Sequence, residues 1–159
     1  MKLVVEQSPG LYRPATDDEA VAEARRVLAS RHRKGSRLDS PSEVKDFLVV
    51  RMAGLEREVL SAVFLTAQHS VIEYREIFHG TLTQTAVYPR EIVRLALILN
   101  AGAVILAHNH PSGEPEPSRA DEYLTTQVKS ALALLDVRLL DHIVVGGDRT
   151  VSMAERGLM

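Results

Sequence analysis

The chain contains no cysteine, and this absence excludes disulfides, thiolate nucleophiles and cysteine-ligated zinc. It also excludes the zinc deaminases, whose signature requires a Pro-Cys-x-x-Cys sequence. A His-Glu-x-x-His sequence is missing as well, so the helical zinc-protease motif is excluded. No apolar run reaches the roughly 18 residues of a membrane span, and the first residues lack the pattern of a signal peptide. We therefore expect a cytoplasmic protein that has no membrane partner.

The composition is otherwise that of an ordinary soluble chain. Of its 159 residues, 45% are apolar and 25% are charged, which is enough for one sizeable core. The net charge of −2 provides no global basic field that would attract nucleic acid. We predict one catalytic domain over residues 40–159, preceded by an extension over residues 1–39 that holds one helix and a basic linker. Nothing in the sequence indicates the oligomeric state.

Apolar periodicity and capping residues predict the order of helices and strands. Helices are expected to begin at Thr16, Ser40, Pro89 and Ser118, because each is a capping residue or a first-turn proline. Short apolar runs bounded by turn residues predict the strands, and together the elements indicate an α/β fold with a single mixed β-sheet flanked by helices. The expected strands are residues 59–66, 71–78, 103–107, 140–145 and 150–153, while Leu3-Val4-Val5 is either a small edge strand or a disordered lead.

Residues 108–121 have the spacing of a metal site. His108 follows the buried strand predicted at 103–107, and His110 lies on the same face because side chains alternate along an extended chain. A Pro/Gly-rich loop then leads to a helix start at Ser118, which directs Asp121 in the first turn back toward the histidines. Two imidazoles and one carboxylate make a three-ligand zinc site with an open position for water, and this arrangement is typical of catalysis.

A zinc-bound water needs a general base, and the stretch itself contains no obvious one. Glu58 is the strongest candidate, because it directly precedes an apolar run that could pair with the 103–107 strand. Glu56 is the alternative, and it would lie on the same face as Glu58 if the strand began early. Glu58 could also be an ordinary solvated acid, since Glu73 and Glu76 are available as well.

These motifs resemble a known family. The pattern Glu58 … His108-x-His110-Pro111-x7-Ser118-x2-Asp121 looks like the JAMM (MPN+) metalloprotease motif. The likeness covers about residue 42 to the end of the chain, and its most specific part is the set of two histidines, proline, serine and aspartate. Four further stretches are similar to the RadC family: Gly80-Thr81-Leu82, Val87-Tyr88-Pro89-Arg90-Glu91, Ala107-His108-Asn109-His110-Pro111-Ser112-Gly113 and Asp141-His142.

The resemblance implies a JAMM/MPN-like fold, related to the cytidine-deaminase-like architecture, with one zinc per chain. His108, His110 and Asp121 would hold the zinc, Glu58 would be the base, and Ser118 would donate a hydrogen bond to the oxyanion of a tetrahedral intermediate. Ser118 and Asp121 also fit a helix capping box. The capping interpretation is compatible with metal binding by Asp121, but it competes for the hydroxyl of Ser118.

The other histidines are interpreted as structural or surface residues. His69 lies in a predicted turn, and His79 lies near the end of a predicted strand. His142 lies within a strand, so we interpret it as a packed, hydrogen-bonded core histidine with Asp141 as its neighbour.

Two functions from different classes remain open. The leading hypothesis is a zinc-dependent hydrolase that acts on a peptide or isopeptide-like bond. The alternative is a non-catalytic metal-binding module associated with DNA repair or genome maintenance, a role attached to the RadC name. The basic cluster at residues 31–37 could contact phosphates, but it lacks interleaved aromatic residues and fits a solvated helix end followed by a linker. A nuclease is less favoured, because one zinc without a cluster of cations serves a phosphodiester poorly.

Overall fold

The computed structural model describes residues 3–31, 35, 37–38, 40–80 and 87–159. The chain forms two compact units, Met1–Arg31 and His32–Met159. The division predicted from the sequence, after residue 39, stays a prediction. Most of the basic cluster at 31–37 lies outside the described residues, as do residues 81–86. Within the described part of the chain, no helix is long and apolar enough to cross a membrane.

The first unit is a hairpin followed by a helix. Strands β1 (Val4–Ser8) and β2 (Leu11–Pro14) pair antiparallel, and Gly10 adopts a φ of 81° in the turn between them. Helix α1 (Asp17–Arg31) begins after Thr16, whose hydroxyl accepts a hydrogen bond from the backbone of Glu19. The sequence predicted this helix, and it left the first strand open between a small edge strand and a disordered lead. It did not predict β2, because four mostly exposed residues show no apolar alternation.

The second unit contains the mixed α/β architecture expected from the sequence. Its five-stranded sheet has the order β4-β3-β5-β6-β7, in which only the β5–β6 pair is parallel. The hairpins predicted between β3 and β4 and between β6 and β7 are both present. The strands are β3 (Val59–Leu65), β4 (Val71–His79), β5 (Ala103–Asn109), β6 (Arg138–Gly146) and β7 (Arg149–Ser152).

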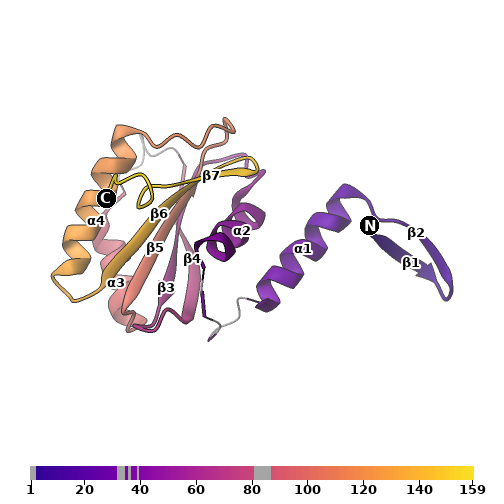
Figure 1. Ribbon diagram of the computed structural model, residues 1–159, viewed down its shortest axis with the longest axis horizontal. Helices are drawn as coiled ribbons and strands as arrows, with labels where there is room; N and C mark the ends of the chain where they lie inside the picture. The colour runs from indigo at the N-terminus through magenta and orange to yellow at the C-terminus, as the bar shows by residue number, and fades with distance from the viewer. Residues whose placement is uncertain (1–2, 32–34, 36, 39, 81–86) are drawn as a thin grey trace. The chain divides into compact units, whose positions relative to one another are not determined.

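Helices cover both faces of this sheet (Figure 1). Helix α2 (Pro41–Met52), capped by Ser40, packs on one face, and α3 (Pro89–Ile98) and α4 (Arg119–Ala133) pack on the other. Because side chains alternate along a strand, Val63 and Leu65 of β3 belong to the core under α2, while Leu60 and Phe64 belong to the core under α3 and α4. Both faces of the central strands are therefore buried.

The connections place the candidate site at one end of the sheet. Helix α4 links the parallel strands β5 and β6, so its first turn lies beyond the carboxyl end of β5, where α/β proteins commonly bind ligands. Strand β5 runs to Asn109, two residues further than predicted, so His108 lies within the strand rather than after it. The residue of β3 that pairs with His108 is Leu60, and this register brings the residues preceding β3 to the same end of the sheet.

The loop after His110 packs directly on the backbone of β6. A Cβ atom added to Gly146 would lie 2.6 Å from the nitrogen of Pro115 and 2.7 Å from the carbonyl oxygen of Gly113. Gly147, the next residue, has nothing within 4 Å of such an atom, but its φ is +61°. The two glycines therefore meet different demands, close packing at Gly146 and a left-handed backbone at Gly147.

We expect Gly146→Ala to lower the free energy of unfolding by about 1–3 kcal/mol, because the atoms it meets are mostly backbone and cannot move aside cheaply. Urea denaturation of the purified variants measures the change. Gly147→Asn is the matched control, with an expected loss below about 1 kcal/mol because asparagine tolerates a left-handed backbone. Equal stability of the two variants would contradict the close packing of this loop.

Candidate metal centre

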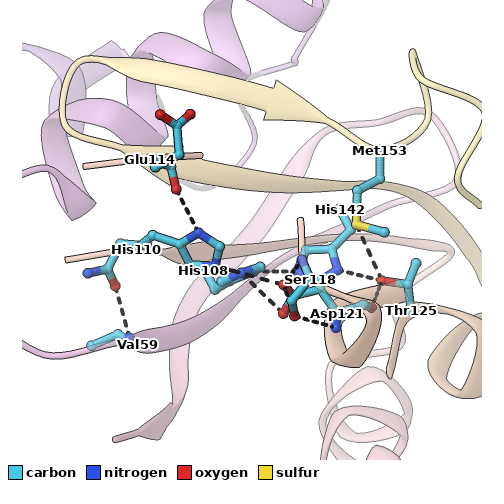
Figure 2. Close-up of polar contacts among 10 residues, drawn as sticks. Val59, His108, His110, Glu114, Ser118, Asp121, Thr125, His142 and Met153 are labelled. Carbon is cyan, nitrogen blue, oxygen red and sulfur yellow. Dashed lines mark hydrogen bonds and ion pairs between the residues drawn. The ribbon is translucent and has the colours of Figure 1, made fainter. Parts of the chain in front are cut away.

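Four potential metal ligands converge at the end of β5. Glu58, His108, His110 and Asp121 each offer one ligand atom, and these atoms all lie within 4.8 Å of one another. They come from the residue before β3, from β5, from the residue after β5 and from the first turn of α4. Figure 2 shows His108, His110 and Asp121 with their hydrogen-bonding neighbours. The sequence analysis predicted all four residues as the centre of one site.

The two histidines direct the same nitrogen atom toward each other. His110 Nδ1 lies 2.8 Å from the carbonyl oxygen of Glu114, and since a carbonyl only accepts, Nδ1 carries the proton. His108 Nδ1 lies 2.8 Å from Nε2 of His142. The Nε2 atoms of His108 and His110 are 2.9 Å apart. In neutral His110, Nε2 is therefore a lone-pair donor that faces the site.

The two carboxylate oxygens of Asp121 have different surroundings: one is bonded to the helix cap, and the other faces the histidines. Its Oδ2 accepts hydrogen bonds from the backbone nitrogen and the hydroxyl of Ser118, at 2.7 and 2.6 Å. Its Oδ1 is buried without a hydrogen-bond partner, 3.3 Å from His108 Nε2. Burial alone raises the pKa of Asp121, but the contact with His108 and the two bonds from Ser118 lower the pKa by more, so the carboxylate stays ionised.

The donor set fits a zinc ion. A tetrahedral site with bonds of about 2.0–2.1 Å separates its ligand atoms by about 3.3 Å. The Nε2–Nε2 distance of 2.9 Å and the distance of 3.3 Å from His108 Nε2 to Asp121 Oδ1 lie near this value. His110 Nε2 lies 3.8 Å from the other carboxylate oxygen, Oδ2. Oδ1 of Asp121 is also an unpaired buried oxygen, and a cation at this point would satisfy it.

Glu58 lies on the same face as the histidines, and it is half-buried. It precedes β3 by one residue, so strand alternation groups it with Leu60, which is paired with His108. The strand does not begin early, which was the condition for Glu56 as the alternative base. Glu56 lies in a bend, is exposed, and is not one of the four clustered residues.

Ser118 caps helix α4 through both halves of the predicted capping box. Its hydroxyl donates to Asp121 Oδ2 and accepts from the backbone nitrogen of Asp121, at 2.6 and 3.2 Å. The single hydroxyl proton is therefore directed at the carboxylate. A bond from Ser118 to a substrate oxyanion would require the hydroxyl to turn, so that role stays a prediction.

Residues 38–158 match the RadC-like JAB domain. The chain belongs to the RadC family. A RadC-like JAB domain and a Glu/His/His/Asp group able to hold a metal fit a JAMM-like metallohydrolase.

Three curated relatives, each described as a UPF0758 protein, share more than half of the aligned residues with this RadC-family chain. That from Leptothrix cholodnii is 56% identical over 142 residues, covering 89% of this chain and 64% of its own. Those from Methylibium petroleiphilum and Nitrosomonas eutropha are 57% and 54% identical, over 86% and 89% of this chain and 61% and 63% of their own. The chain therefore spans slightly less than two thirds of the length of these relatives.

His142 and Thr125 support the candidate ligands, and neither was predicted as a site residue. His142 is completely buried between His108 and Thr125, as the sequence analysis expected of a core histidine, but its link to a ligand was not foreseen. Burial lowers the pKa of His142 well below its ordinary value, and His108 lowers it further, so the ring is neutral. The Asp141 carboxylate accepts from the backbone nitrogen of His142 at 2.7 Å, whereas the His142 ring is bonded to His108 and Thr125.

Asn109 is a third residue that the sequence analysis did not single out. Lying between the two histidines, it points to the opposite face of the sheet and is buried. Its Oδ1 accepts from the backbone nitrogen of Val59 at 2.9 Å, and its Nδ2 donates to the carbonyls of Arg57 and Leu55 at 3.0 and 3.4 Å. Asn109 thereby fixes the backbone on both sides of Glu58.

One side of the centre is open. A cleft of about 490 Å³ is bordered by His110, Asn109, Glu56, Gly54 and Gly113, among other residues. His108 and Asp121 have no exposed side-chain surface, whereas the side chain of His110 is 18% exposed. The site thus combines two buried ligands with a third that faces solvent.

We expect Asn109→Leu to destabilise the domain by about 2–4 kcal/mol, because it leaves a buried N–H and two carbonyls without their partner at about 1–3 kcal/mol for each fully buried group. Urea denaturation gives the value. Gln127→Leu, on the exposed side of α4, is the control and should change stability by less than about 0.5 kcal/mol. If Asn109→Leu were as stable as this control, Asn109 would not hold the segment before β3.

Proposed function

We propose that this RadC-like domain is a zinc-dependent hydrolase that cleaves an amide or isopeptide-like bond. One observation carries the proposal: the unpaired Oδ1 of Asp121 and the facing Nε2 atoms of two histidines lie together beside Glu58, at the border of a cleft. A structural zinc site is normally closed by four protein ligands, whereas a catalytic site has three and an open position. Glu58 is then available for proton transfer.

The residues have separate roles in the proposed reaction. When bound by His108, His110 and Asp121, zinc supplies a Lewis acid for the carbonyl and a water whose pKa is lowered toward about 7. Glu58 accepts the proton of the attacking water and then donates it to the leaving nitrogen. Ser118 turns from its cap to donate to the developing oxyanion.

The cleft supports a peptide-like substrate. It borders His110, and Gly54, Gly113 and Gly147 are among the residues around it, so these three positions leave room for an extended main chain. The substrate of the whole protein is also part of the proposal, because this chain spans less than two thirds of its curated relatives.

Purified protein should contain about one zinc per chain, and His108→Ala and Asp121→Ala should both lose it, because each removes one of three ligands. Metal analysis after incubation with zinc and removal of the excess measures the content. His79→Ala, which changes an exposed histidine outside the four-residue cluster, should keep the metal. A wild-type protein that takes up no zinc would contradict the proposed site.

Glu58→Gln should retain zinc and reduce turnover by about 10²–10⁴-fold, because glutamine keeps the shape of the side chain but cannot accept the proton. Turnover is measured on a panel of peptide and isopeptide substrates cleaved by the wild type. Glu73→Gln is the matched control and should stay active, because Glu73 is also half-buried but lies opposite Phe64, near the other end of β3. Full activity of Glu58→Gln would refute Glu58 as the base, and the non-catalytic metal-binding alternative predicts that neither substitution has an effect on function.

A further inference from the structure

A continuous chain of buried hydrogen bonds joins the two most buried metal-ligand candidates. His108 Nδ1 lies 2.8 Å from His142 Nε2, and His142 Nδ1 lies 2.6 Å from the hydroxyl of Thr125. That hydroxyl donates to the backbone carbonyl of Asp121, also at 2.6 Å. Figure 2 shows His142 between His108 and Thr125. All four residues have essentially no solvent exposure.

The direction of these bonds is fixed from the Asp121 end. A carbonyl only accepts, so the single proton of Thr125 points to Asp121 rather than to the sulfur of Met153, which is 3.6 Å away. The Thr125 oxygen must then accept from Nδ1 of His142. With that proton on Nδ1, the Nε2 atom of His142 is left to accept from Nδ1 of His108.

We propose that His142 and Thr125 are positioning residues that hold the proton of His108 on Nδ1 and direct its Nε2 lone pair at the metal. The proposal rests on the metal site of the proposed function and extends it to residues that touch no metal. A hydrogen-bond partner behind a ligating imidazole sets its tautomer and orientation, and loss of such a partner typically costs 10–100-fold in metal affinity.

The Nδ1 proton of His110 is also fixed by a hydrogen bond, but the acceptor is a backbone carbonyl rather than a side chain. Its Nδ1 donates to the backbone carbonyl of Glu114, which can only accept. Both rings therefore carry their proton on Nδ1, and both Nε2 atoms face the same point. For His108 this orientation depends on side chains, so substitutions can remove it.

Two pairs of variants test the proposal by zinc affinity, measured by competition with a chelating dye. His142→Leu should bind zinc about 10–100-fold more weakly than wild type, whereas His142→Gln should recover part of the loss, because its amide oxygen can accept from His108. Thr125→Val should weaken binding about 10-fold or more, since it leaves His142 without the acceptor that fixes its proton, and Thr125→Ser should bind as wild type. Equal affinity of Thr125→Val and Thr125→Ser would overturn the proposal.

A spectroscopic measurement covers the case in which His142→Leu fails to fold. Nitrogen-15 NMR of the imidazole rings should find the His142 proton on Nδ1 in wild type and in Thr125→Ser, and on Nε2 in Thr125→Val. A proton on Nε2 of His142 in the wild-type protein would mean that the hydrogen bonds run in the opposite direction, and it would overturn the proposal.

Neither measurement uses a substrate, so the outcomes for positioning and for catalysis are separate. An inactive protein that shows the expected order of zinc affinities would refute the proposed hydrolysis and support the role of His142 and Thr125. An active protein whose zinc affinity is unchanged in all four variants would support the proposed hydrolysis and refute the role of His142 and Thr125.

Discussion

The carboxylate of Asp121 is a buried negative charge whose Oδ1 atom has no hydrogen-bond partner, and the rest of the site is arranged around it. An isolated buried charge is costly, so an ionised carboxylate here requires a cation or donors nearby. Ser118 satisfies one oxygen with its backbone nitrogen and its hydroxyl, while the other oxygen faces His108. The Nδ1 atoms of both imidazoles already have hydrogen-bond partners, so their Nε2 atoms and Oδ1 of Asp121 converge on one point. Three such acceptor atoms could hold a metal ion.

The fold brings this set together through a single strand. In β5, His108 faces α4 while Asn109 faces the opposite side, and His110 follows at the start of the loop. The crossover through α4 returns Asp121 to the end of β5, and the antiparallel partner β3 brings Glu58 to the same end. In the proposed site, three consecutive residues therefore supply one metal ligand, the support of the base and a second ligand, so a small shift of β5 would disturb all three.

Sequence information was sufficient for the parts of the site that depend on local spacing. His108 and His110 share a face because of strand alternation, and Ser118 with Asp121 forms the capping box that the sequence predicted. The order of helices and strands was predictable as well, because apolar periodicity and turn residues are also local features of the sequence. The roles of His142, Thr125 and Asn109 depend on contacts that span 17 to 54 positions, and no local pattern encodes such pairing. Strand β2 was missed because it lacks the apolar alternation that signals a strand.

The two histidines are held by different means, and this difference divides the site into a fixed half and an adaptable half. His108 is held from the core by His142, which lies on β6 and is itself bonded to Thr125 of α4. His110 is held by the carbonyl of Glu114, in a loop that packs on Gly146 and borders the cleft. A ligand in the cleft can therefore act on His110 and its loop without disturbing the buried pair of His108 and Asp121. In the proposed zinc site, metal retention then depends mainly on the core, while access to the fourth coordination position depends on the loop.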